Sequence, residues 1–216
     1  MTEEIPSKDL FMMCKAIDVK AFGNLPPLFH FRLCRRDELE VWKQMHLDFP
    51  ASPAQHDEYM QSMTDYYNNV YAGNTELFFN KCLFACNRND EPIGRCLIWK
   101  AYGLINTIHW YKVLKDYEGR GIWRALLTAV MKELKEEDYP VYLHTHLSSY
   151  RAIKLYSDFG FCLVSNPVIG FRNNDLEECL PILQKYMPIK DFKNLKITQA
   201  PKDFLDAAAS SKIAEF

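Results

Sequence analysis

One stretch, residues 113–131, constrains the fold more than any other part of the chain. Just before it, residues 108–113 have the β-branched and aromatic composition of a buried or half-buried strand. A short polar turn containing Gly119 and Gly121 follows, and the apolar residues within 122–130 then recur at the spacing of one helix face. The stretch therefore predicts a strand, a tight turn and a helix in immediate succession.

The turn has the composition of an anion site. Glycine lets the backbone approach a ligand closely, and the first amides of a helix have no carbonyl partners, so a phosphate suits this position. A Gly-x-Gly turn alone, however, often only reverses the chain. The third glycine of a dinucleotide site and the Gly-Lys-Ser/Thr of a Walker loop are both missing. At this stage phosphate binding and a purely structural turn both stay open.

A second stretch narrows the choice between a phosphate site and a purely structural turn. Residues 141–145 are typical of a strand, and residues 149–159 are typical of a helix that ends at Gly160 and leads into another strand. The chain therefore repeats the strand-to-helix pattern shortly after the glycine turn.

The two stretches together resemble the GNAT superfamily of acyl-CoA-dependent N-acyltransferases. The family's turn pattern, Arg/Gln-x-x-Gly-x-Gly/Ala, corresponds to residues 118–123. Its later pattern, Asn-x-x-Ala-x-x-Leu-Tyr followed by Gly-Phe, corresponds to residues 149–156 and then 160–161. With weaker matches upstream, the resemblance covers roughly residues 28–172.

The resemblance implies an α/β (mixed α+β) fold, the GNAT fold. In this fold a central mixed and splayed β-sheet is flanked by helices on both faces. The upstream elements expected from the sequence are a strand at 28–34, helices at 36–45 and 57–70, and a β-hairpin at 83–99; a last strand is expected at 168–171.

The resemblance also implies a cofactor, acetyl-CoA, as the acyl donor, and no metal. Turn amides would surround the coenzyme pyrophosphate, and the backbone of the central strand would pair with the pantetheine arm. The cofactor-binding residues implied in this way are Tyr111, Val113, Leu114, Glu118, Gly119, Arg120, Gly121, Ile122, Trp123, Ser149 and Ala152.

Three of these residues depart from the family pattern. Glu118 replaces Arg or Gln and puts a negative charge beside the expected phosphates, which Arg120 and Arg124 would offset. Trp123 replaces a small residue, and Ser149 replaces an asparagine and also suits a helix N-cap. The departures keep two alternatives open: a non-catalytic GNAT-fold sensor that binds acyl-CoA, and an interaction module.

Direct transfer to an amine in a ternary complex needs an acid for the leaving thiolate and a base for the amine. By the resemblance, Tyr156 is the acid, although its position also fits a core stripe of the helix. For the base we expect His109, because a histidine with its ordinary pKa near ~6.5 is suited to take a proton from the amine. His144 and His146 on the next strand are rival candidates.

The acceptor is expected to be an amine-bearing small molecule or peptide. Aromatic and acidic residues could line a pocket for a cationic amine, or could be core and solvated helix face. They are Tyr66, Tyr67, Tyr71, Trp99, Tyr102, Trp110, Asp57, Glu58 and Asp65.

Composition sets the remaining expectations. The chain has 216 residues, 48% of them apolar, which suits one well-cored domain with appendages: an N-terminal arm (1–27), the acyltransferase domain (28–172) and a C-terminal helical extension (173–216). A formal charge of -2 argues against nucleic-acid or membrane-surface binding. The arm would pack on the domain or on a second copy in a homodimer.

Cysteine usage and the first residues bear on the compartment. Seven scattered cysteines form no metal set, so we expect reduced thiols in a cytoplasmic protein. The start, Met1–Lys8, lacks the basic end and apolar core of a secretory signal, and no apolar run reaches membrane-spanning length.

Overall fold

The computed structural model describes residues 5–216. These residues form two compact units, each built from separated segments of the chain. Unit 1 contains the residues up to Phe22, Trp99–Ile108 and Leu134–Phe216; unit 2 contains Gly23–Ile98 and His109–Glu133. The boundary falls inside strands β4 (Pro92–Ala101) and β5 (Ile105–Val113), which therefore contribute residues to both units.

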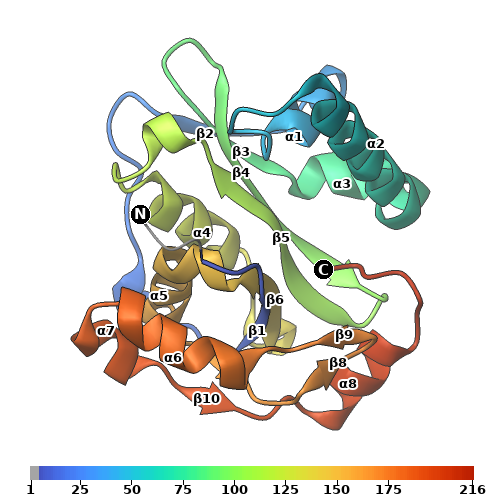
Figure 1. Ribbon diagram of the computed structural model, residues 1–216. Helices are drawn as coiled ribbons and strands as arrows, with labels where there is room; N and C mark the ends of the chain where they lie inside the picture. The colour runs from blue at the N-terminus through green and yellow to red at the C-terminus, as the bar shows by residue number, and fades with distance from the viewer. Residues whose placement is uncertain (1–4) are drawn as a thin grey trace. The chain divides into compact units, whose positions relative to one another are not determined.

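The strands form a mixed sheet (Figure 1). β1 (Asp9–Cys14) pairs antiparallel with β6 (Val141–His146) and with β7 (Phe161–Val164), while β10 (Ile197–Thr198) runs parallel to β7. β6 pairs in parallel with the first half of β5. β3 (Leu83–Cys86) pairs antiparallel with β4 and with β2 (His30–Leu33), so the order is β10-β7-β1-β6-β5-β4-β3-β2. With its flanking helices, this sheet confirms the predicted mixed α/β class.

Strand β1 lies inside the sheet of unit 1, although its residues belong to the predicted arm. Five of its six residues, Leu10–Cys14, are apolar and almost completely buried. Asp9 pairs with His146 at one end of β1, and Cys14 pairs with Val141 at the other. An apolar strand paired on both sides buries its backbone hydrogen bonds as well as its side chains. Residues 1–4 of the arm lie outside the described residues, and the three-part division stays a prediction.

The strand expected at 168–171 does not join the large sheet. Val168–Ile169 forms β8, which pairs antiparallel with β9 (Arg172–Asn173) in a separate two-stranded sheet. The physical reason is that β7 already has a neighbour on each side, β1 and β10, so neither edge of β7 is free. Gly170, in the left-handed region at φ +63°, makes the tight turn between β8 and β9.

Four helices belong to unit 1 in full. α5 (Tyr150–Asp158) follows β6 and buries Ile153, Leu155 and Tyr156, as the predicted amphipathic pattern requires. The later chain forms α6 (Leu176–Tyr186), α7 (Ile189–Asn194) and α8 (Lys202–Ala209). The ring of Phe204 in α8 stacks on Tyr142 of β6 at 3.9 Å between centroids, which ties the C-terminal extension to unit 1.

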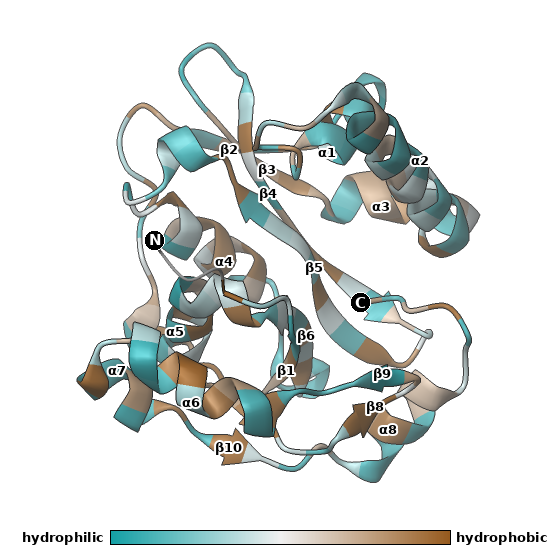
Figure 2. Ribbon diagram, in the orientation of Figure 1, coloured by the Kyte–Doolittle hydropathy of each residue, from teal (hydrophilic) through white to brown (hydrophobic). Residues whose placement is uncertain are grey.

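Unit 2 carries α1 (Leu39–Gln44), α2 (Pro53–Val70), α3 (Thr75–Lys81) and α4 (Ile122–Lys132). The first three lie close together in Figure 1. Helix α2 begins four residues before the predicted start, because Ser52 and Gln55 form a capping box and Pro53 occupies the first turn. Most of α2 is hydrophilic in Figure 2, as expected of a helix that buries only a narrow stripe.

An aromatic cluster forms the core of unit 2. The indole of Trp42 in α1 meets the rings of Tyr71 and Phe78 edge to face, at 5.8 and 5.2 Å between centroids. All three side chains are fully buried. Edge-to-face aromatic pairs add roughly 0.5–1.5 kcal/mol each beyond the area they bury. The cluster therefore stabilises the packing of the three helices against β4 and β5.

Candidate functional site

The glycine turn before α4 has the backbone conformation that requires glycine. Gly119 and Gly121 lie in the left-handed region at φ +72° and +82°, and Gly121 is the N-cap of α4. A Cβ added at Gly119 would meet no atom within 4 Å, so the requirement for glycine there is conformational. The turn thus presents the unpaired first amides of an 11-residue helix at an open surface.

The charged residues of the turn are exposed. Glu118 and Arg120 both lie at the surface, and Arg120 donates from Nη2 to the carbonyl of Asp116 at 3.0 Å. The guanidinium also lies over the ring of Tyr117, 5.2 Å from its centroid. Arg120 is therefore held beside the turn, where its charge opposes that of Glu118.

Trp123 packs against another predicted cofactor residue. Its ring meets that of Tyr111 at 4.6 Å between centroids, and the Tyr111 hydroxyl donates to the Trp123 carbonyl. Ile122, the residue before it, is fully buried. The large side chain of Trp123 therefore packs against Tyr111 of β5, and this contact lets the start of α4 accommodate a tryptophan.

The end of β5 pairs with β4. The amide of Leu114 donates to the Ile93 carbonyl at 2.8 Å, and Val113 packs so close to Gly94 that a Cβ there would lie 3.0 Å from its side chain. The Leu114 amide is therefore engaged within unit 2. A pantetheine contact at Leu114 could therefore use only its carbonyl, and the contacts at Tyr111 and Val113 stay predictions.

Trp110 within β5 has an unusual backbone conformation, which sequence reasoning missed. Its φ is +50°, a rare value for a bulky residue. Its carbonyl accepts a hydrogen bond from Nε of Arg95 in β4 at 3.1 Å. No glycine marks the position in the sequence.

His109, the residue before Trp110, is buried, with 2% of its surface exposed. Its Nδ1 lies 2.5 Å from the hydroxyl of Tyr71 and 3.4 Å from that of Tyr66. Burial raises the pKa of Tyr71 well above its ordinary value, so this hydroxyl keeps its proton. Two tyrosines of the predicted acceptor set, Tyr66 and Tyr71, therefore contact the predicted base, His109.

Unit 1 holds the other predicted site residues. Tyr156 is 5% exposed, and its ring lies 5.9 Å from that of Phe161. Ser149 occupies the N-cap position of α5 without making a capping bond, because a 3-10 turn (Leu147–Ser149) leads directly into the helix. The expected capping role of Ser149 is therefore wrong. Ala152 lies half-buried one turn into α5.

A cluster of Asp9, His144 and His146 lies at the edge where β1 meets β6. His144 donates from Nε2 to Oδ1 of Asp9 at 2.9 Å, and Nδ1 of His146 lies 3.1 Å from the same oxygen. Burial, and next the charge of Arg172, lowers the pKa of His144 to about 4, so its ring is neutral near pH 7. The His-x-His spacing could have indicated the pair, but nothing local in the sequence points to Asp9.

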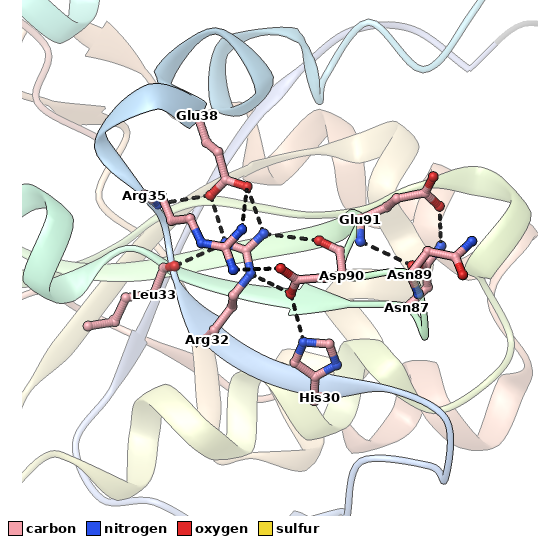
Figure 3. A network of polar contacts seen from close by, with 9 residues as sticks. All are labelled: His30, Arg32, Leu33, Arg35, Glu38, Asn87, Asn89, Asp90 and Glu91. Atoms are coloured by element: carbon pink, nitrogen blue, oxygen red, sulfur yellow. Dashed lines mark hydrogen bonds and ion pairs between the residues drawn. The ribbon is translucent and has the colours of Figure 1, made fainter.

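Within residues 5–216, two groups of side chains have ligand atoms close enough for a metal ion. One is the Asp9–His144–His146 cluster, and the other comprises His30, Cys86 and Asp90. In the second group Asp90 accepts from Nε of Arg32 at 2.7 Å and from Nη2 of Arg35 at 2.6 Å (Figure 3).

The arginines make the second group unsuited to a cation. Hydrogen bonds from Arg32, His30 and Arg35 hold the pKa of Asp90 well below its usual range. The network extends to Glu38, whose two carboxylate oxygens accept from Arg32 at 2.7 Å each (Figure 3). These contacts describe an ion-pair network, and the absence of a metal cofactor stays a prediction.

The sequence model of the acetyltransferase (GNAT) family matches residues 41–161, more than half of the chain. The chain belongs to the GNAT acetyltransferase family. The match contains the glycine turn and reaches Phe161 at the end of the second predicted motif, so it confirms the resemblance seen in the sequence.

Solved GNAT structures resemble the chain in fold. An acetyltransferase from Colwellia psychrerythraea has a TM-score of 0.50 at 16% identity, covering 73% of this chain and 53% of the other. One from Sphaerobacter thermophilus has a TM-score of 0.43 at 21% identity, covering 66% and 44%. A GNAT-like protein from Streptococcus suis has a TM-score of 0.48 at 14% identity, covering 73% and 58%. The GNAT chain spans about half the length of these structures.

No curated protein matches the chain. In the part of the GNAT chain that the structure describes, every helix is too short or too polar to cross a membrane. The predicted site residues divide between the units: His109 and the residues from Tyr111 to Trp123 lie in unit 2, and Ser149, Ala152 and Tyr156 lie in unit 1.

Proposed function

We propose that the protein transfers the acetyl group of acetyl-CoA to an amine by direct attack in a ternary complex. The observation that carries the proposal is the turn at Gly119 and Gly121, whose left-handed backbone opens the N-terminus of α4 to an anion. The coenzyme pyrophosphate is the anion this family would bring there. The acceptor is an amine on a small molecule or peptide, and the protein acts in the cytoplasm without a metal, a nucleic acid or a membrane.

The reaction requires a base, an acid and groups that polarise the thioester carbonyl. The amine nitrogen loses a proton to a base and attacks the thioester carbonyl carbon; the carbon–sulfur bond then breaks, and the leaving thiolate takes a proton from an acid. We assign the acid to Tyr156. Backbone groups of Tyr111 and Val113, just after the left-handed Trp110, would polarise the carbonyl.

Three histidines were expected as candidates for the base, and the low pKa of His144, about 4, leaves His109 and His146. His109 is buried and bonded to tyrosine hydroxyls, which suits proton transfer through them. His146 has half of its side chain exposed and pairs with Asp9, and a carboxylate that orients a histidine is a common arrangement for a general base. We keep His109 as the proposed base and treat the His146–Asp9 pair as its rival.

A thermal-shift titration of the full chain tests the cofactor class. A ligand present at ~100 times its dissociation constant stabilises the folded state by about 2.7 kcal/mol. We expect a saturable rise in melting temperature with acetyl-CoA and with coenzyme A, followed by acetylation of amines in a screen. Binding without turnover of any amine would favour the alternative, a sensor of acyl-CoA, and no binding would favour an interaction module, with size measurements showing whether the chain dimerises.

A further inference from the structure

Arg95 is a fully buried cation in the middle of β4. None of its surface is exposed, and its guanidinium lies between two indoles, 4.5 Å from the ring centroid of Trp42 and 5.5 Å from that of Trp110. Cation–π contacts of this kind stabilise a desolvated guanidinium by about 2 kcal/mol. This is far less than the hydration that a buried charge loses.

The polar contacts of Arg95 leave its charge uncompensated. Nε donates to the Trp110 carbonyl at 3.1 Å, and Nη2 donates to Nδ1 of His46 at 2.6 Å. Nη1 is buried and has no hydrogen-bond partner in residues 5–216. Neutral groups and rings surround the guanidinium, and the loss of hydration lowers the pKa of Arg95 to about 10. Arginines buried in proteins are ordinarily paired with a carboxylate.

Two further buried polar groups lie next to Arg95. One is Nε1 of Trp42, the ring that stacks on the guanidinium, and it has no hydrogen-bond partner in residues 5–216. The other is the hydroxyl of Tyr59 in α2, which interacts with Arg95 itself: the charge of Arg95 and a hydrogen bond with its side chain lower the pKa of Tyr59 against the larger effect of burial. The phenol that accepts from Arg95 still has its own proton to donate. Three elements of unit 2, α1, α2 and β4, thus each supply a buried donor to one neighbourhood.

Donors without an acceptor describe a site for an anion. Nη1 is the unpartnered donor of the guanidinium, and a carboxylate can accept from it with one oxygen and from Tyr59 or Trp42 with the other. One carboxylate also balances one buried positive charge, whereas a phosphate dianion would leave an excess negative charge. The half-buried rings of His46, Tyr66 and Trp110 adjoin the guanidinium or its indole cage, so the neighbourhood reaches the surface of unit 2.

We propose that Arg95, with Tyr59 and Trp42, binds a carboxylate carried by the amine acceptor. This inference rests on the proposed acetyl transfer and names its substrate class: amines with a carboxylate, such as amino acids or a peptide with a nearby carboxyl group. The site lies beside the predicted acyl position, because Arg95 donates to the carbonyl of Trp110, the residue before Tyr111.

The test compares amines that differ only by a carboxylate. Calorimetric titrations of the full chain use glycine with methylamine, L-phenylalanine with phenethylamine, and L-lysine with cadaverine. We expect at least one amino acid to bind about 30-fold or more tightly than its decarboxylated partner, since an unpaired buried charge is expensive. Equal binding within every pair, or no binding of any amino acid, overturns the inference.

Variants connect that preference to the site. Arg95→Met should remove it, and Tyr59→Phe, which deletes one hydroxyl without changing charge, should weaken amino-acid binding several-fold. Tyr142→Phe is the matched control, a buried tyrosine of β6 outside the predicted acceptor set, whose ring stacks on Phe204. If Arg95→Met does not fold, Tyr59→Phe decides: wild-type binding of the amino acid then overturns the inference.

The outcomes separate the site from the function. Acetylation of amines with no preference for a carboxylate supports the proposed function and overturns the anion site. Binding of an amino acid that depends on Tyr59 and Arg95, in a protein that does not bind acetyl-CoA, supports the site and overturns the function.

Discussion

His144 and Asp9, 135 positions apart in the sequence, are joined by a 2.9 Å hydrogen bond from Nε2 to Oδ1. The contact exists because β1 pairs with β6 in a register that sets Asp9 opposite His146 and Phe11 opposite His144. One carboxylate oxygen thereby orients two imidazoles. A strand from the predicted arm thus supplies a polar group to the histidines that sequence reasoning considered as bases.

The buried His144 should make stability depend on pH. Its folded-state pKa of about 4 lies below the unfolded value near ~6.5, so the unfolded chain binds the extra proton first as pH falls. The contribution is complete above pH ~6.5 and is lost as pH falls towards the folded pKa. We expect the melting temperature to fall between pH 7 and 4 less steeply in His144→Asn than in wild type. His56→Asn, at an exposed pair in α2, should keep the wild-type slope.

The identity of the base can be settled by paired substitutions. If the proposal is correct, His109→Gln should lower kcat by about 100-fold, the usual worth of a general base, with the coenzyme-induced thermal shift unchanged. His146→Gln should then act weakly. The reverse result, with Asp9→Asn giving an intermediate loss, would assign the base to the cluster at β1 and β6.

Tyr156→Phe tests the acid. Removing the phenol hydroxyl should lower kcat by about 100-fold while acetyl-CoA still raises the melting temperature, because the ring continues to fill the buried position. Tyr142→Phe is the control, a buried tyrosine whose stacking on Phe204 does not depend on its hydroxyl. A Tyr156→Phe enzyme with wild-type turnover would leave Tyr156 as a core residue only.

Gly121→Glu should abolish coenzyme binding. The substitution places a non-glycine residue at φ +82° and a negative charge at the amides that the pyrophosphate would use. Gly73→Glu, an exposed glycine where an added Cβ meets nothing within 4 Å, controls for the charge. Titrations of both variants with acetyl-CoA give the comparison, and unchanged affinity in Gly121→Glu would remove the turn from the site.

Gly160, directly after α5, should not tolerate a side chain. It lies at φ +94°, and an added Cβ would be 2.8 Å from the carbonyl oxygen of Ala16. Strain of this kind costs on the order of 1–3 kcal/mol, to which the contact adds. We expect Gly160→Ala to lower the free energy of unfolding in urea by at least that amount, while Gly73→Ala should change it by less than about 1 kcal/mol.

Local patterns in the sequence were enough to predict the elements nearest the glycine turn. The turn at Gly119 and Gly121, the helix after it and the hairpin around Asp90 each depend on neighbouring residues, and the structure places them where the patterns predict. The predicted start of α2 at residue 57 was four residues late, because a proline usually interrupts a helix and Pro53 does not. Behind Ser52 it is the first residue of a capped helix instead.

The rest depends on contacts that no local pattern encodes. The composition of β1 indicates an apolar segment, but only the paired edges of β6 and β7 decide where it lies. The left-handed Trp110 has no glycine to announce it and relies on Arg95, fifteen positions away, to hold its carbonyl. Sequence reasoning missed Asp9 and Arg95 as site residues for the same reason: the residues they contact lie far away in the sequence.

The long separation in sequence between β1 and its partner strands also determines the order in which the two units can fold during synthesis. The segments of unit 2 are complete once Glu133 has been synthesised, whereas β1 must wait for β6 and β7, and the Cys14 thiol meets the Phe159 carbonyl 145 positions later. Until then a strand of five apolar residues has neither of its neighbours. Unit 2 can therefore fold during translation, and unit 1 closes late, with its first strand the segment most exposed to aggregation and to chaperones.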